Sequence, residues 1–111
     1  MTETHDMIRG VARHEPDILE SLLQARVENL EASGLDPRTY SLTSIAALVA
    51  SGASPASYIW HVGLALDAGV TAEEILGLLV ALGPTVGTTR VVAAAPEIAT
   101  ALGVDLELMD E

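Results

Sequence analysis

The sequence predicts an all-α fold, and three observations support this prediction. Helix start signals recur, with a capping residue directly before proline at Asp36–Pro37 and Ser54–Pro55. Between such signals, apolar residues recur at spacings of three and four, as in a helix that packs on one face. The chain has one Trp, two Tyr and no Phe, so small aliphatic side chains must fill the core. Such a core suits closely packed helices, of which we expect five or six.

The N-terminal part predicts an arm followed by an amphipathic helix. Residues 1–13 are polar and charged without sustained periodicity, which is typical of a loose arm. Pro16 stands where a first helical turn tolerates proline, and Gly34 ends the helix. Its apolar positions at helical spacing are Ile18, Leu19, Leu22, Leu23, Val27 and Leu30. The opposite face is polar and acidic, so we expect it to face water.

Two further helices follow from the capping signals. The first runs from Asp36–Pro37 to about Gly52, and the next from Ser54–Pro55 to Gly69. Almost every face of the second of these is apolar, which predicts a helix buried by more than one neighbour.

The C-terminal helices are delimited by a capping box, two prolines and a glycine. Thr71 and Glu74 have the spacing of a capping box and open a helix through Leu82, which Gly83–Pro84 should kink or break. We expect separate segments over residues 88–95 and 96–102, and an acidic tail over residues 104–111. One helical domain then covers residues 14–103, without a linker.

Composition excludes several classes of partner. The 111 residues carry a net charge of −11, with five Arg and no Lys, which argues against binding to nucleic acids or anionic membranes. A mean hydropathy of +0.40 is high for a monomer, yet no apolar run is long enough to span a membrane. The excess apolar surface predicts a homo-oligomer.

With no basic and apolar leader at the N-terminus, we expect a cytoplasmic protein, and the residue usage resembles that of GC-rich bacterial genomes.

One compact polar constellation stands out in this apolar chain. Ser54, Ser57 and His61 are spaced by three and four residues, which places two hydroxyls and an imidazole on one helical face. With the following segment of residues 68–87, this string resembles the carboxymuconolactone decarboxylase and alkylhydroperoxidase D superfamily over residues 36–103. The peroxidase branch carries Cys-x-x-Cys-x-x-x-His where this chain has Ser54-x-x-Ser57-x-x-x-His61.

The resemblance carries expectations about fold and assembly. It implies an alkylhydroperoxidase D-like helical domain in which the helices of residues 54–69 and 71–82 form a buried antiparallel hairpin. It narrows the expected assembly to a homotrimer or a homohexamer.

The chain departs from the peroxidase branch in two respects. It contains no cysteine, so no dithiol and disulfide cycle can run, because a serine hydroxyl has no thiolate chemistry. The glutamate that the peroxidase branch places upstream of its cysteines is also missing, since no Glu occurs between Glu31 and Glu73. We therefore expect no peroxidase activity.

His61 is the principal catalytic candidate, and Ser57 accompanies it. A neutral imidazole works as a general acid or base near pH 7, but a core histidine bonded to a carbonyl is an equal alternative. Ser57 either faces the same cavity as His61 or bonds the carbonyl four residues back. Ser54 either contacts a ligand or simply caps its helix. A Ser57–His61 nucleophilic pair is disfavoured, because no orienting acid is near in sequence.

Candidates for substrate binding are Arg38, Arg90 and Tyr58. A carboxylated substrate such as a muconolactone needs a bidentate cation, and these are the two arginines in the resembling region. The alternatives are a solvated Arg38, an Arg90 paired with an acidic neighbour, and a Tyr58 that packs. We expect no metal and no cofactor, since the His-acid pairs at His5 and His14 are adjacent residues without ligand spacing.

Two functions remain open at this point. The first is a cofactor-free lyase or isomerase for a small carboxylated or lactone metabolite, with His61 as general acid or base. The second is a family member without catalysis, which binds a small ligand or serves as an oligomeric scaffold. A pocket around His61 with Arg38 or Arg90 in it would favour the enzyme.

Overall fold

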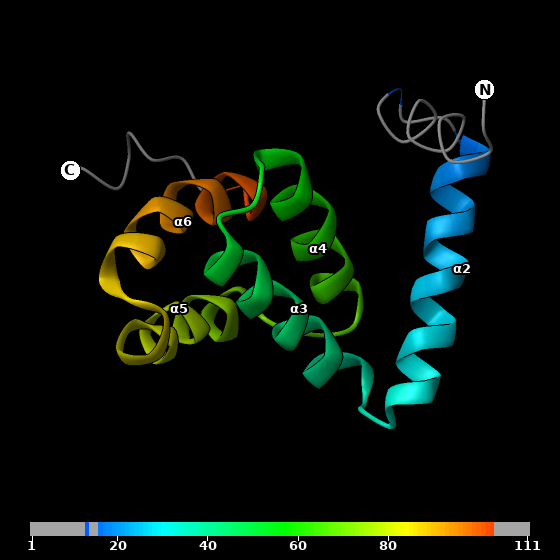
Figure 1. Cartoon of the computed structure of the whole chain (residues 1–111), viewed down its shortest axis with the longest axis horizontal. Coiled ribbons are helices and arrows are strands. Elements are labelled where there is room, and N and C mark those ends of the chain that lie inside the picture. Colours follow the sequence, from blue (N-terminus) through cyan, green and yellow to red (C-terminus); the bar gives the residue numbers. More distant parts are fainter. Residues whose placement is uncertain (1–12, 14–15, 104–111) are drawn as a thin grey trace. The chain divides into compact units, whose positions relative to one another are not determined.

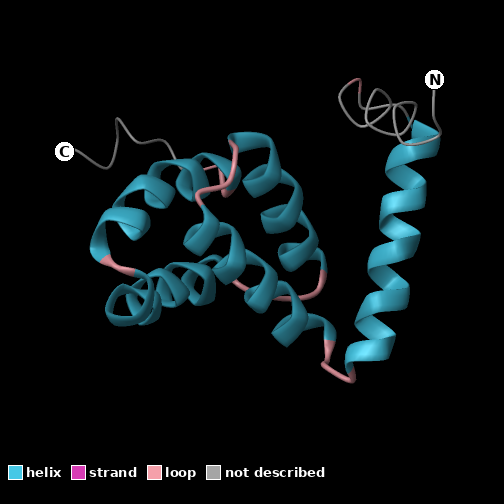
Figure 2. Ribbon diagram, viewed as in Figure 1, coloured by secondary structure: helices cyan, strands magenta, loops and turns pink. Residues whose placement is uncertain are grey.

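The protein is all-helical throughout the part that the computed structural model describes, residue 13 and residues 16–103 (Figures 1 and 2). Its five helices in that part are α2 (Pro16–Ser33), α3 (Pro37–Ser51), α4 (Pro55–Asp67), α5 (Ala72–Val86) and α6 (Thr88–Ala101). The all-α class expected from the sequence is confirmed. The arm, apart from residue 13, and the acidic tail of residues 104–111 lie outside the described residues.

The chain forms two compact units that divide between Leu35 and Asp36. In the first unit the described helix is α2, none of whose residues is buried. Leu22, Leu23 and Val27 on this helix are 36%, 37% and 44% exposed. Within the first unit, the described residues of α2 therefore form no buried core of their own.

Helix starts in the second unit follow the capping signals of the sequence. Asp36 Oδ1 accepts a hydrogen bond of 2.8 Å from the Thr39 amide at the start of α3. At the start of α5, Thr71 Oγ1 accepts from the Glu74 amide at 3.1 Å, and Glu74 Oε1 accepts from the Thr71 amide at 3.0 Å. These bonds satisfy amides that have no partner inside the helix.

The two internal prolines do not end their helices. Of the kink or break expected at Gly83–Pro84, the break is excluded, and the expected division at Pro96 is wrong. Helix α5 continues through Pro84 to Val86, and α6 runs unbroken through Pro96. A proline inside a helix deprives the carbonyl four residues earlier of its amide donor. Those carbonyls belong to Val80 and Val92, whose side chains are 81% and 63% exposed, so water can replace the missing donor.

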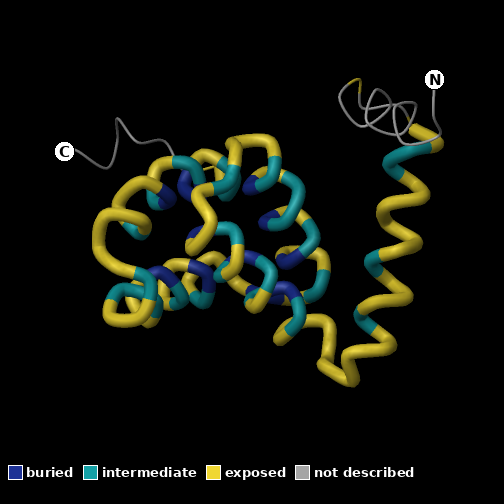
Figure 3. Tube along the Cα trace, in the orientation of Figure 1, coloured by how far each residue is buried: buried dark blue, intermediate teal, exposed yellow. Residues whose placement is uncertain are grey.

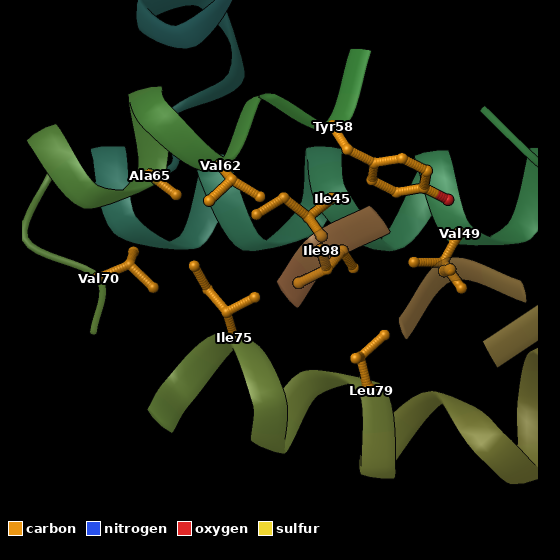
Figure 4. Packing of buried hydrophobic residues seen from close by; sticks show 10 residues of the cluster. Ile45, Val49, Tyr58, Val62, Ala65, Val70, Ile75, Leu79 and Ile98 are labelled. Atoms are coloured by element: carbon orange, nitrogen blue, oxygen red, sulfur yellow. The ribbon is translucent and has the colours of Figure 1, made fainter. Parts of the chain in front are cut away.

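The core of the second unit lies where α3 meets the three helices that follow it (Figures 1 and 3). Helix α3 contacts α4, α5 and α6, and both α4 and α5 also pack on α6. The expected buried hairpin of α4 and α5 is therefore wrong, because the main packing partners of both helices are α3 and α6. Figure 4 shows the buried side chains, which include Ile45, Val49, Tyr58, Val62, Ala65, Val70, Ile75, Leu79 and Ile98.

Apolar side chains also remain on the surface of this unit. Ile59 and Leu66 on α4 are 57% and 42% exposed, and Leu76 and Val80 on α5 are 45% and 81% exposed. The two residues on α4 are seven positions apart and the two on α5 are four positions apart, so each pair forms an apolar stripe on one face of its helix. In the described part of the chain, no helix is long and apolar enough to cross a membrane.

Candidate functional site

Four of the six candidate residues lie where α3 ends and α4 begins, a place we call the α3–α4 junction. Ser54, Ser57 and Tyr58 stand in the capping residue and first turn of α4. The fourth, Arg90, reaches this junction from α6 and lies against Gly52 at the end of α3. The chain thus brings together side chains that are more than thirty positions apart in the sequence.

The two serines form a hydroxyl pair at the start of α4. Ser54 is the N-cap, and its Oγ lies 3.4 Å from the Ser57 amide that donates to it. The two Oγ atoms lie 3.2 Å apart and share a hydrogen bond in which either can be the donor. Ser54 therefore has a capping role, while the Ser57 hydroxyl is half-buried and paired with that of Ser54.

His61 lies one helical turn beyond Ser57 on the same face of α4. This face is half-buried along its length, at Ser57, His61, Leu64 and Ala68. It runs beside the fully buried positions of the helix, and the Nδ1 atom of His61 is shielded from solvent. Since Cβ atoms four residues apart on a helix lie about 6 Å from each other, the imidazole and the Ser57 hydroxyl can reach a common ligand.

Tyr58 is a core residue whose hydroxyl supports the junction. Its side chain is 2% exposed, lies beside Val49 in the core (Figure 4), and donates a hydrogen bond of 3.3 Å to the Leu48 carbonyl. Burial raises the pKa of the Tyr58 phenol above its ordinary value, and the charge of Glu97 raises it further, while the charge of Arg90 opposes them. The phenol is therefore protonated at neutral pH and remains a hydrogen-bond donor.

Arg90 presents an open guanidinium at the junction. The residue is exposed, and within the described part of the chain no hydrogen bond or ion pair engages its guanidinium. Its Nη1 lies against the face of Gly52 that carries no side chain. A guanidinium offers five N–H donors in a fixed fork that matches a carboxylate.

Arg38, in contrast, is engaged by the protein. It donates to the Gly69 carbonyl and forms an ion pair with Glu74, so it ties the start of α3 to the loop and capping box that precede α5. Hydrogen bonds from the Thr71 amide and from Arg38 hold the pKa of Glu74 below its ordinary value. Arg38 therefore has a structural role in this chain.

Arg38 is also remote from the α3–α4 junction. It contacts Gly69, just beyond the C-terminal end of α4, whereas Ser54 precedes the N-terminal end of the same helix. A helix of 13 residues is about 20 Å long, so these two groups cannot hold one small ligand.

Sequence reasoning did not single out Gly52 and Glu97 as parts of this region. Gly52 was expected only to end a helix, and Glu97 lies two helical turns after Arg90 on α6. The spacing of seven was the one signal that placed Glu97 and Arg90 on a common face.

Among the described residues, no group of three acidic, His or Cys side chains has the geometry to hold a metal ion.

Comparison with known proteins places most of the chain in a single family. Residues 16–100 match the family model described as the carboxymuconolactone decarboxylase family. No curated protein and no solved structure matches the chain. The matched range includes α2, α3, α4 and α5 and nearly all of α6.

Proposed function

The chain belongs to the carboxymuconolactone decarboxylase family, and from this premise we propose that it is a cofactor-free lyase or isomerase for a small carboxylated or lactone metabolite. The observation that carries the proposal is that Arg38 and Arg90 differ in whether other protein groups bind their guanidinium. Protein groups engage the Arg38 guanidinium, whereas that of Arg90 is exposed and engaged by none of the described residues. An open cation against Gly52, two residues before the hydroxyl pair begins at Ser54, suits an anionic substrate.

Each residue of the proposed site has a separate role. The Arg90 guanidinium binds the carboxylate of the substrate through two parallel hydrogen bonds. The His61 imidazole removes a proton from the carbon next to the lactone carbonyl and returns it to the product. The Ser57 hydroxyl orients the substrate or the imidazole, and Ser54 holds Ser57 in place through the bond of 3.2 Å between their hydroxyls. Arg38 has no role in this site, because it lies at the other end of α4.

Deuterium exchange tests the proton-transfer step without knowledge of the natural substrate. The probe is γ-carboxy-γ-butyrolactone in D₂O, and NMR follows the loss of the proton signal next to the lactone carbonyl. We expect the native protein to accelerate this exchange and the His61→Gln variant to fall back to the buffer rate, with Ser57→Ala in between. General acid–base catalysis typically contributes about 10²- to 10⁴-fold. Equal exchange with native protein and with His61→Gln would refute the role of His61.

The second candidate function is a non-catalytic, oligomeric scaffold or small-ligand-binding protein. The apolar stripes on α4 and α5 favour it, because residues such as Val80, 81% exposed, are left for burial against another molecule. The deuterium experiment separates the two candidates. A scaffold protein gives no exchange above the buffer rate at any concentration, although it can still bind the probe.

A further inference from the structure

Gly52 has a role beyond ending α3, because a side chain of another helix occupies the space where its own would be. A Cβ placed on Gly52 would overlap Nη1 of Arg90 and lie 3.6 Å from its Cζ. Since the overlapping atom is at the far end of a flexible side chain, any larger residue here displaces the guanidinium rather than the backbone.

Other glycines with left-handed backbone conformations provide the comparison. Gly34, Gly87 and Gly103 have φ values of 73°, 103° and 79°, and a Cβ on any of them meets nothing within 4 Å. A Cβ on Gly69 would lie 3.9 Å from Arg38, which is an ordinary contact. Among the described glycines, Gly52 is thus the one where an added Cβ would displace a neighbouring guanidinium.

The end of α3 lies against Arg90, and no described residue there accepts a hydrogen bond from it. The Leu48 carbonyl already accepts bonds from the Gly52 amide at 3.0 Å, the Ala53 amide at 3.1 Å and the Tyr58 hydroxyl at 3.3 Å. The last turn of α3 has no basic residue of its own, so Arg90 supplies the cation that favours a helix C-terminus. Its N–H groups stay available to a ligand.

We propose that Gly52 is a positioning residue that holds the Arg90 guanidinium against the end of α3, in the orientation that receives a substrate carboxylate. This proposal rests on the proposed function, since it presumes that Arg90 binds the carboxylate. It adds a consequence of the missing side chain at position 52, and it predicts that ligand affinity depends on a residue that need not touch the ligand.

The test compares two glycine variants, one at a position where Arg90 occupies the space of the added Cβ and one at a position where this space is empty. Gly52→Ala and Gly103→Ala introduce the same methyl group at left-handed positions of the same unit, so both should lower the thermal midpoint by similar amounts. Binding of γ-carboxy-γ-butyrolactone is then measured by NMR titration. We expect Gly52→Ala to weaken binding about 10- to 100-fold, as for loss of a hydrogen bond to a charged group, and Gly103→Ala to leave it unchanged.

An Arg90→Ala background shows whether Gly52 acts through the arginine. In this background Gly52→Ala should cause no further loss of affinity, because no guanidinium remains to be displaced. Equal affinity of Gly52→Ala and native protein would overturn the positioning role while leaving the proposed function intact. A further loss in the Arg90→Ala background would also overturn it.

Two readouts distinguish a failure of the proposed function from a failure of the inference. If native protein binds the methyl ester of the probe as tightly as the acid, carboxylate binding by Arg90 is refuted, and the role of Gly52 in binding fails with it. The NMR contact between the Gly52 Hα protons and the Arg90 side chain is measured without ligand. Its absence in native protein would refute the positioning role directly.

Discussion

Replacing Ser54 and Ser57 together by cysteine should convert the hydroxyl pair into a redox-active dithiol. The two Oγ atoms lie 3.2 Å apart, and a disulfide requires about 2 Å between sulfurs, so the side chains need to approach by about 1 Å. The N-terminus of α4 lowers the pKa of a thiol placed there, which raises the fraction of reactive thiolate. His61 lies one turn further along the same face of α4.

The stability of the double variant follows from two opposing contributions. Loss of the Ser54 cap, whose bond of 3.4 Å is long, should cost about 0.5–1 kcal/mol. Closing a four-residue loop by a disulfide should stabilise the oxidised form by about 2 kcal/mol. The oxidised variant should therefore unfold about 4–8 °C above the native protein, and the reduced variant slightly below it.

The assay measures hydroperoxide consumption in the presence of a dithiol reductant. We expect no turnover by the native protein, because it has no cysteine and a thioether lacks the thiolate that attacks peroxide. The double variant should turn over through an intramolecular disulfide, and the single variants Ser54→Cys and Ser57→Cys, which can form only a mixed disulfide with the reductant, should form no intramolecular disulfide. Turnover by the native protein above the reductant background would refute the reasoning. So would a double variant that never forms the disulfide.

Three further predictions concern stability and assembly. Ile45→Ala removes a side chain that is 0% exposed and should cost about 2–5 kcal/mol in urea unfolding, whereas Ile59→Ala, at a position that is 57% exposed, should change stability by less than about 0.5 kcal/mol. The pKa values of Asp36 and Glu74 are lowered by the fold, so both groups stabilise it above their ordinary pKa values, and this contribution is lost as pH falls through the lowered values. The Asp36→Asn, Glu74→Gln variant should accordingly lose less stability between pH 6 and pH 3 than the native protein, and an equal acid loss would contradict this assignment. Val80→Glu should lower the mass measured by light scattering if α5 contributes to a homotrimer or homohexamer, and an unchanged oligomer would exclude this face.

The sequence predicts the helix starts well because their causes are local. The capping hydroxyl or carboxylate and the amide that it binds lie within three residues at Asp36, Ser54 and Thr71. The prolines were misjudged for a different reason. Whether Pro84 and Pro96 interrupt a helix depends on whether the deprived carbonyl can reach water, and that depends on tertiary exposure.

The candidate site is predictable only where it lies on one helix. The spacing of Ser54, Ser57 and His61 places them on one face of α4, and the structure adds the contact between the two hydroxyls. The sequence does not distinguish Arg38 from Arg90, because their partners are remote. Arg38 pairs with a residue 36 positions away, and Arg90 packs on a glycine from a different helix. No local pattern encodes either contact.

The absence of buried residues in α2 has a consequence for amide hydrogen exchange. An isolated helix of 18 residues is marginal in water, because helical stability comes mainly from packing of an apolar face. In a dilute, monomeric sample, exchange of the α2 amides far faster than that of the α3 and α4 amides, whose side chains form the core of the second unit, would show that α2 has no packing partner in the monomer, and equally slow exchange would show that it has one. If the protein assembles through α2, these amides become protected as the concentration rises. The exchange rates of the α2 amides then report on assembly at each residue, without a label or a variant.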